Sequence, residues 1–386
     1  MRDSLGPGAD PRSEGGGLQD VNWDALIRSE LDGMRPYEPG LRASEVRERS
    51  GRADVLKLSS NEYPDGPFPS ALEAAGRVLS RLNRYPDGSC RALRARLAER
   101  WGVDERFISV GNGSNELIRL IGQAVLRPGD EVVYAWPSFV VYPTVARLFG
   151  AKAVQVPLTA EQRHDLPAMR AAVNERTRVV FLCNPNNPTG TIYTRDEFEA
   201  FLVGLPEQVL VVVDEAYFEF VDDADYPDGL RTFDGVRPLV VLRTFSKIYS
   251  LAGLRVGYGF MPEPLKRAVD CVREPFNVGS VGQVAAAFSL DDQTEVARRQ
   301  RENLEQKTYL YSGFDRLGIR YIPSHANFVY VLTERPVEVF ESLLSEGVIA
   351  RDFGTAPALR LTVSAANDTD RVVEAFSRTV ARLGSI

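Results

Sequence analysis

The sequence predicts an α/β fold in which a large, doubly wound and mostly parallel sheet is followed by a smaller α+β domain. From about Phe107 onward, strand-like segments alternate with helix-like segments, as expected for successive βα units. Several of the strand-like segments are valine-rich and apolar without interruption, which is typical of strands buried on both faces of a parallel sheet. The candidate strands are Phe107–Val110, Glu131–Ala135, Ala153–Pro157, Arg178–Cys183, Val209–Val213, Leu239–Leu242 and Arg255–Phe260.

The helix-like segments carry apolar residues on one face. In the first, these residues recur at helical spacing from Leu117 to Val125, and Ser114 is the expected N-cap. The last part of the chain reads as a smaller unit with its own helices and short strands. Its expected elements are a helix near residues 293–312, strands at Asn327–Leu332 and Leu359–Val363, and a final helix at Asp368–Leu383.

The domain organisation follows from these patterns. Residues 1–20 are rich in Gly, Pro, Ser, Asp and Arg, and we expect them to form a disordered tail. We expect a large cofactor-binding α/β domain over residues 50–280. Residues 21–49 and 281–386 would form the small α+β domain.

Composition excludes several classes of function. A formal net charge of −7 argues against nucleic acid as the main partner, because phosphate binding needs a basic surface. No apolar run approaches the roughly 20 residues that a membrane span needs. The first residues lack the apolar core of a signal peptide, so we expect a cytoplasmic location. Three scattered cysteines and two histidines predict neither a disulfide framework nor a metal site.

Polar motifs follow several of the predicted strands. Ligands of open α/β sheets bind beyond the carboxyl ends of the strands, so these motifs should meet at one edge. They are the glycine-rich Gly111–Glu116, the proline-flanked Asn184–Gly190, the segment Asp214–Tyr217 and the segment Arg243–Arg255. Taken singly, each could be a tight turn, a helix cap or a polar loop.

Together the motifs indicate one cofactor. Lys247 follows an apolar strand and lies next to Ser246, with Arg255 eight residues later, so it could form a Schiff base with a phosphorylated aldehyde. Asp214 follows a run of valines, and a carboxylate buried there needs a cation such as a protonated pyridine nitrogen. The amide of Asn187 could donate to a phenolate oxygen. These are the contacts that pyridoxal 5'-phosphate requires.

On these motifs the sequence resembles the fold-type I pyridoxal-phosphate aminotransferases, and within them the histidinol-phosphate aminotransferase subfamily. The similarity runs from about Tyr37 to the C-terminus. The matching segments are Ser59–Pro64, Asn83–Gly88, Gly111–Glu116, Asn184–Gly190, Asp214–Tyr217, Arg243–Lys247, Ala252–Arg255, Asn327–Val329 and Leu359–Val363.

The resemblance implies a role for each cofactor residue. Lys247 would form the Schiff base and then move the proton in the reaction, Asp214 would pair with the ring nitrogen, and Tyr217 would bond to the phenolate oxygen with Asn187. Phe139 would stack on the ring, and Tyr85 would reach the phosphate from the second subunit of a homodimer. The residues expected around the phosphate are Gly113, Ser114, Asn115, Ser246 and Arg255.

The resemblance also implies a substrate side. Arg351 and Arg360 would bind the anionic group of the substrate, since a guanidinium recognises phosphate or carboxylate in a bidentate manner. Tyr37 and Asn61 would line the entrance. The sequence departs from the family pattern beside this pocket, where Ser364 and the residue after it replace the usual Gly-Thr pair.

The expected reaction is transfer of the amino group of L-histidinol phosphate to 2-oxoglutarate, a step of histidine biosynthesis. An aromatic amino acid such as phenylalanine, or a specialised donor of secondary metabolism, is the alternative donor. A phosphothreonine-type decarboxylase is a different reaction class on a similar scaffold. A transaminase-like transcriptional regulator is disfavoured, because nothing before Tyr37 has a helix-turn-helix pattern.

Overall fold

The computed structural model describes residues 22–354 and 356–386 and divides into two compact units, Met1–Tyr37 and Glu38–Ile386. The described part of the first unit contains helix α1 (Trp23–Leu26) and a 3-10 turn at Ser29–Leu31. The tail expected at residues 1–20 lies outside the described residues. All further elements belong to the second unit.

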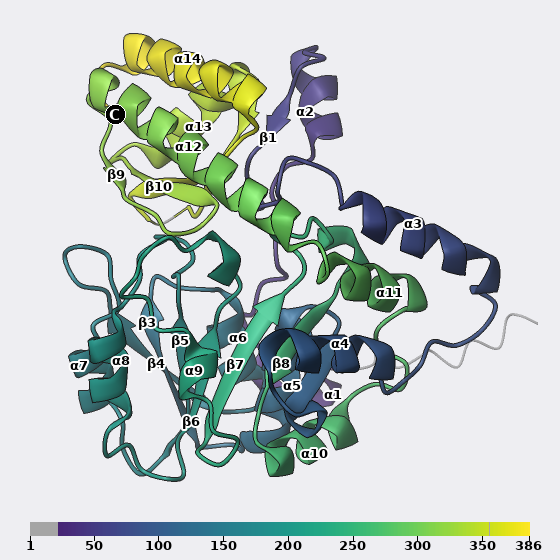
Figure 1. The fold of residues 1–386 in the computed structure, drawn as a ribbon. Coiled ribbons are helices and arrows are strands. Elements are labelled where there is room, and N and C mark those ends of the chain that lie inside the picture. The colour runs from purple at the N-terminus through teal and green to yellow at the C-terminus, as the bar shows by residue number, and fades with distance from the viewer. Residues whose placement is uncertain (1–21, 355) are drawn as a thin grey trace, which may run out of the picture. The chain divides into compact units, whose positions relative to one another are not determined.

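A seven-stranded sheet forms the centre of the second unit (Figure 1). Its spatial order is β2-β8-β7-β6-β5-β3-β4. β8 runs antiparallel to both of its neighbours, and the other pairs are parallel. The predicted mostly parallel sheet is therefore confirmed. The strands are β2 Ile108–Gly111, β3 Glu131–Trp136, β4 Lys152–Pro157, β5 Thr177–Cys183, β6 Leu210–Asp214, β7 Leu239–Thr244 and β8 Gly257–Phe260.

Helices cover both faces of this sheet, which explains the uninterrupted valines. In β6, Val212 packs into the core that contains residues of α5, α6 and α10. Its neighbours Val211 and Val213 point to the other face and pack with residues of α7 and α8. Successive side chains of a strand alternate between faces, so every residue of such a strand must be apolar.

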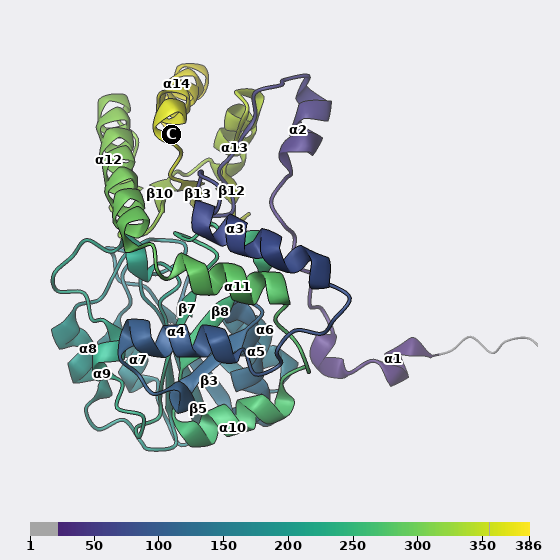
Figure 2. The same cartoon turned by 45° about the vertical axis from the view of Figure 1, so that its right-hand side comes forward.

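The helices of this layer and of its surroundings have the following bounds: α2 Ala43–Ser50, α3 Pro69–Val78, α4 Arg91–Trp101, α5 Ser114–Val125, α6 Val141–Leu148, α7 Leu166–Ala171, α8 Arg195–Leu202, α9 Gly229–Thr232, α10 Glu263–Val272 and α11 Ser280–Ser289. Helices α3 and α11 lie side by side (Figure 2). The turn η4 (Phe218–Phe220) follows β6.

A second, four-stranded antiparallel sheet has the order β12-β13-β10-β9. Its strands are β9 Tyr321–Ile322, β10 Phe328–Leu332, β12 Arg351–Asp352 and β13 Ala358–Thr362. Side chains of α12 (Gln293–Leu317), α13 (Pro336–Ser345) and α14 (Ala366–Leu383) pack against it in one apolar core.

A short parallel pair joins distant parts of the chain. β1 (Leu56–Lys57) pairs with β11 (Val348–Ile349), so a segment shortly after residue 50 lies beside the C-terminal elements. The division into domains at residues 49/50 and 280/281 stays a prediction.

Two local expectations differ from the structure. Helix α5 is capped by Gly113 rather than Ser114, which is its first helical residue, because Gly113 adopts a positive φ of 82° that turns the chain into the helix. β8 begins at Gly257 rather than Arg255, because Arg255 lies in the left-handed region with φ 55°. Within the described residues, no helix is long and apolar enough to cross a membrane.

Candidate active site

The first group of the site is the carboxylate of Asp214 at the carboxyl end of β6. It is buried, and Oδ2 accepts a hydrogen bond of 2.9 Å from the hydroxyl of Tyr142. Oδ1 has no hydrogen-bond partner among the described residues. Burial raises the pKa of Asp214 to about 6, and the bond from Tyr142 opposes that rise. A buried, half-satisfied carboxylate at this place requires a cationic donor.

Tyr217 joins three parts of the chain. Its hydroxyl accepts hydrogen bonds from Nδ2 of Asn61 at 2.9 Å and from Nδ2 of Asn187 at 3.3 Å. Burial raises the pKa of Tyr217 well above its usual range. The Asn187 amide is itself oriented, because its Oδ1 accepts a bond of 2.6 Å from Nη1 of Arg360. Two amide N–H donors therefore converge on one phenolic oxygen.

Lys247 lies three residues beyond the end of β7. Its Nζ donates to the carbonyl of Ser60 at 3.3 Å and lies 5.5 Å from the ring centroid of Tyr217. The pKa of Lys247 is lowered from 10.5 to about 7, chiefly by burial and in addition by the positive charges of Arg360 and Arg255. A substantial fraction of this amine is neutral, and therefore nucleophilic, near neutral pH.

Gly113, Ser114, Ser246 and Arg255 come together where α5 begins. Nη1 of Arg255 lies 3.5 Å from Oγ of Ser246, which also accepts a bond of 3.0 Å from Oγ1 of Thr244. Gly113 has a φ of 82°, and a Cβ there would lie 2.6 Å from Nη2 of Arg255, so a side chain would strain the backbone and displace the guanidinium. The helix N-terminus, two hydroxyl groups and a guanidinium form a site suited to an anion.

Arg351 and Arg360 lie side by side on two neighbouring strands of the second sheet. They are direct register partners in the antiparallel pair of β12 and β13, so their side chains leave the same face. Arg360 is buried and also donates from Nη2 to the carbonyl of Ser59 at 2.7 Å. Arg351 is partly exposed and donates from Nη1 to the carbonyl of Glu38 at 3.1 Å. Arg360 therefore places a positive charge beside Asn187, and Arg351 adds a second one on the neighbouring strand.

Four further predicted residues have the following surroundings. The side chain of Tyr85 is 82% exposed and its ring stacks on Phe276, with centroids 4.7 Å apart. Tyr37 belongs to the first compact unit, where it is exposed. Asn115 is exposed on the first turn of α5. Phe139 packs edge-on against Tyr142, with centroids 5.7 Å apart.

Three contributors were not predicted from the sequence. Tyr142 donates to Asp214, and the carbonyl of Ser60 accepts from Lys247. Thr362 accepts from the backbone N–H of Asn61 at 2.9 Å and donates to its side chain at 3.3 Å. Tyr142 lies in the first turn of α6, three residues after the predicted Phe139, and no motif in the sequence marks it.

The donor set fits pyridoxal phosphate. The free Oδ1 of Asp214 is available to a protonated ring nitrogen, and the hydroxyl of Tyr217 with the amide of Asn187 suits a phenolate oxygen. The anion site beside Gly113 suits the phosphate, and Lys247 suits the aldehyde. Each polar group of the cofactor thus meets a side chain of complementary chemistry.

The match to known proteins is extensive. A family model described as aminotransferase class I and II matches residues 53–378. Histidinol-phosphate aminotransferase of Moorella thermoacetica is 43% identical over 359 residues, covering 92% of this chain and 93% of that protein. Histidinol-phosphate aminotransferase 2 of Carboxydothermus hydrogenoformans is 46% identical over 343 residues, covering 88% of this chain and 94% of that protein.

A solved structure agrees in fold. The crystal structure of histidinol-phosphate aminotransferase from Sinorhizobium meliloti, in complex with pyridoxal-5'-phosphate, matches with a TM-score of 0.85 at 27% identity. The match covers 93% of this chain and 98% of that one.

Proposed function

The chain belongs to the class I and II aminotransferases, and we propose that it transfers the amino group of L-histidinol phosphate to 2-oxoglutarate. The products would be imidazole acetol phosphate and L-glutamate. The observation that carries this choice of donor is the 43% and 46% identity, over about nine tenths of the chain, to two proteins named for it. The cytoplasmic location expected from the sequence remains part of the proposal.

When bound, pyridoxal phosphate supplies an aldehyde for the amino group and a ring that withdraws electrons from the substrate α-carbon. Asp214 would keep the ring nitrogen protonated through Oδ1, while Tyr142 holds Oδ2 in place. Nζ of Lys247 would accept the proton from the α-carbon of the donor and would then act as the acid that gives it up on the cofactor side of the transferred nitrogen. A pKa of about 7 suits both directions of that transfer.

Arg360 and Arg351 would bind the anionic end of each substrate. The donor carries a phosphate and 2-oxoglutarate carries two carboxylates, so both substrates present an anion to the same pair of guanidinium groups. Arg360 also donates to Oδ1 of Asn187, whose amide N–H would donate to the phenolate oxygen of the cofactor. Substrate binding at Arg360 would therefore be coupled to the position of Asn187. Asn61, which donates to Tyr217, would line the same pocket.

A donor comparison tests the proposal. Purified holoenzyme is incubated with 2-oxoglutarate and, in separate reactions, with L-histidinol phosphate, L-histidinol or L-phenylalanine, and glutamate formation is measured. We expect kcat/KM for L-histidinol phosphate to exceed the other two values by at least about 10²-fold, since a bidentate phosphate contact contributes several kcal/mol. A higher value for phenylalanine would assign the enzyme to the aromatic donors, and release of CO₂ would indicate a decarboxylase.

The proposal includes a homodimer in which Tyr85 reaches the phosphate of the neighbouring subunit. The exposure of Tyr85 and of its stacking partner Phe276 supports it, because both rings are free to be covered by a second chain. Mixing inactive Lys247→Ala with weakened Tyr85→Ala chains would generate hybrid dimers. We expect restoration to about a quarter of the parent activity, from one intact site in half of the dimers. A mixture no more active than its components would exclude the role in trans.

A further inference from the structure

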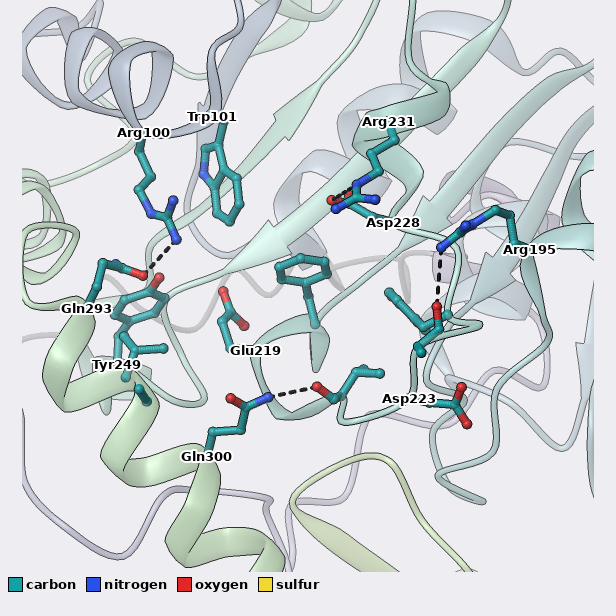
Figure 3. A pocket seen from close by; sticks show the side chains of 16 residues that line it. Arg100, Trp101, Arg195, Glu219, Asp223, Asp228, Arg231, Tyr249, Gln293 and Gln300 are labelled. Carbon is teal, nitrogen blue, oxygen red and sulfur yellow. Dashed lines mark hydrogen bonds and ion pairs between the residues drawn. The ribbon is translucent and has the colours of Figure 1, made fainter.

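A cavity of about 480 Å³ lies apart from the residues of the active site (Figure 3). It is bounded by the C-terminal end of α4, the turn η4, the loop from Val221 to Arg231 and the N-terminal turns of α12. Its volume falls within the range that small-molecule sites occupy.

Glu219 is the central polar group of this cavity. Its side chain points into the space, and the residue is only 8% exposed (Figure 3). Neither carboxylate oxygen has a hydrogen-bond partner among the described residues. Burial raises the pKa of Glu219 to about 7, although the positive charge of Arg243 opposes the rise. An unpartnered carboxylate in such a place is costly unless something else binds it.

The nearest buried cation does not neutralise Glu219. Arg243 already binds Glu215 at 2.8 Å and Asp228 at 2.7 Å, so two carboxylates share its charge. Its Nη1 also lacks a hydrogen-bond partner among the described residues. Glu219 therefore faces the cavity without a hydrogen-bonded counter-charge among the described residues.

Aromatic rings form the walls beside Glu219. Trp101 and Phe218 meet edge to face with centroids 5.8 Å apart, and Tyr226 and Tyr249 also line the space. The guanidinium of Arg243 already lies over Trp101 at 4.3 Å and over Phe218 at 3.5 Å, and that of Arg100 lies over Trp101 at 4.5 Å, so a ligand would meet the remaining aromatic surface of the cavity. A carboxylate surrounded by aromatic rings is a suitable environment for an organic ammonium group.

The rim has the opposite charge. Arg100, Arg195 and Arg231 line the cavity and are exposed. Among the described residues, Arg100 binds Gln293 and lies over the ring of Trp101 at 4.5 Å, Arg195 binds the carbonyl of Ala224, and Arg231 lies 3.8 Å from Asp228. Since a guanidinium has five N–H donors, all three retain donors for an anion.

We propose that this cavity binds a small zwitterion, with its ammonium group against Glu219 and its carboxylate or phosphate group at the arginine rim. An amine without an anionic group would bind none of the rim arginines and would be repelled by their positive charge. An anion without an ammonium group would be repelled by the carboxylate of Glu219. The site goes beyond the proposed transamination and uses none of its residues.

Fluorescence of Trp101 reports binding in the holoenzyme. The probes are three zwitterions of increasing charge separation, glycine, 4-aminobutanoate and 6-aminohexanoate, with butylamine and butanoate as single-charge controls. We expect at least one zwitterion to change the emission saturably with a Kd below about 1 mM. We expect both single-charge controls to bind at least about tenfold more weakly. An unchanged visible absorbance of the lysine-bound cofactor would show that the probe has not reacted at Lys247.

Two variants complete the test. Glu219→Gln should weaken binding of that zwitterion at least tenfold while the melting temperature is maintained, and Arg231→Gln, at an exposed position, should weaken it to a smaller extent. Trp101→Phe should remove the signal, which separates it from Trp23 and Trp136. The proposal is overturned if no zwitterion saturates, if butylamine binds as tightly, or if Glu219→Gln leaves the Kd unchanged.

Discussion

Burial lowers the pKa of two lysines among the described residues, of which Lys307 is buried and Lys247 is partly exposed, and their surroundings differ. Lys247 lies beyond β7 and donates to the carbonyl of Ser60 over 3.3 Å. Lys307, in the middle of α12, donates to the carbonyl of Ser324 over 2.6 Å. Burial lowers the pKa of both amines, to about 7 for Lys247 and about 8 for Lys307.

The difference lies in the other charges nearby. Arg360 and Arg255 lower the pKa of Lys247 beyond the effect of burial, and Asp214 is close enough to raise it. Only the attraction of Asp222 acts on Lys307 besides burial. A low pKa alone therefore does not mark a reactive lysine. Lys247 differs from Lys307 because two other groups accompany it. One is the carboxylate of Asp214, whose Oδ1 has no hydrogen-bond partner among the described residues, and the other is the anion site at Gly113 and Arg255.

The largest expected effect is a loss of activity when Lys247 is replaced, which replacement of Lys307 should not cause. Lys247→Ala should lower kcat by at least about 10³-fold, because it removes the amine proposed to move the substrate proton. It should also abolish the visible absorbance of the lysine-bound cofactor. Steady-state kinetics and an absorbance spectrum measure both effects.

Lys307→Met is the matched control. It should retain the parent kcat and absorbance, and lose about 1–3 kcal/mol of stability because the carbonyl of Ser324 loses its donor. An active Lys247→Ala enzyme would refute the aminotransferase mechanism. A Lys307→Met enzyme that folds but has lost its activity would refute the contrast between the two lysines.

The next comparison concerns two buried carboxylates five positions apart, Asp214 and Glu219. Both have raised pKa values and oxygens without partners among the described residues. Asp214→Asn removes the charge proposed to hold the ring nitrogen protonated, and kcat should fall by about 10²- to 10³-fold, as for other preorganised electrostatic contacts. Glu219→Gln should leave kcat within about twofold, because no residue assigned to the reaction makes a hydrogen bond to Glu219. Equal losses in kcat would mean that both carboxylates serve one site.

A smaller difference in kcat/KM is expected between substitutions of Arg360 and of Arg351. Arg360→Lys cannot maintain bonds to both Asn187 and Ser59 in one geometry. Loss of one charge-assisted hydrogen bond costs about 1.5–3 kcal/mol, so kcat/KM should fall about 10- to 100-fold. Arg351→Lys, at a more exposed position, should raise KM with less effect on kcat. A stronger effect at Arg351 would make it the principal anion contact.

Much of this site could be predicted because its main residues lie at strand ends. Lys247, Asp214 and Asn187 each follow an apolar run, and parallel strands bring such positions to one edge. Long-range partners could not be found in this way. Thr362 and Asn61 are 301 residues apart, and the carbonyl of Ser60 carries no side-chain signal.

The fold shows the same limit. The strands that were predicted lie within about two residues of their observed bounds, since apolar runs define them. The two-residue strands β1, β9, β11 and β12 were not predicted, because so short a segment carries no pattern. The start of β8 was wrong because the left-handed conformation of Arg255 depends on its tertiary contacts, which the local pattern does not encode. Glu219 looked like an ordinary polar residue, and only its surroundings reveal that its carboxylate has no partner among the described residues.

The smallest predicted effect is a pH dependence that sharpens the comparison of the lysines. A neutral amine is the nucleophile, and the pKa of Lys247 is lowered from 10.5 to about 7. The rate at which cofactor-free protein captures pyridoxal phosphate should therefore rise about tenfold per pH unit below pH 7 and level off above it. Stopped-flow absorbance at fixed ionic strength measures this rate.

Removing a neighbouring cation should move that midpoint. Arg360→Gln eliminates the largest repulsive charge on Lys247, so the pKa and the midpoint of the rate profile should both rise. Lys307→Met should leave the midpoint unchanged, since no interaction between the two amines contributes to either pKa. A midpoint near 10 in the parent protein would contradict the burial of Lys247, because only a solvated amine retains its usual pKa. A parent midpoint near 7 that Arg360→Gln does not shift would assign the lowered pKa to burial alone.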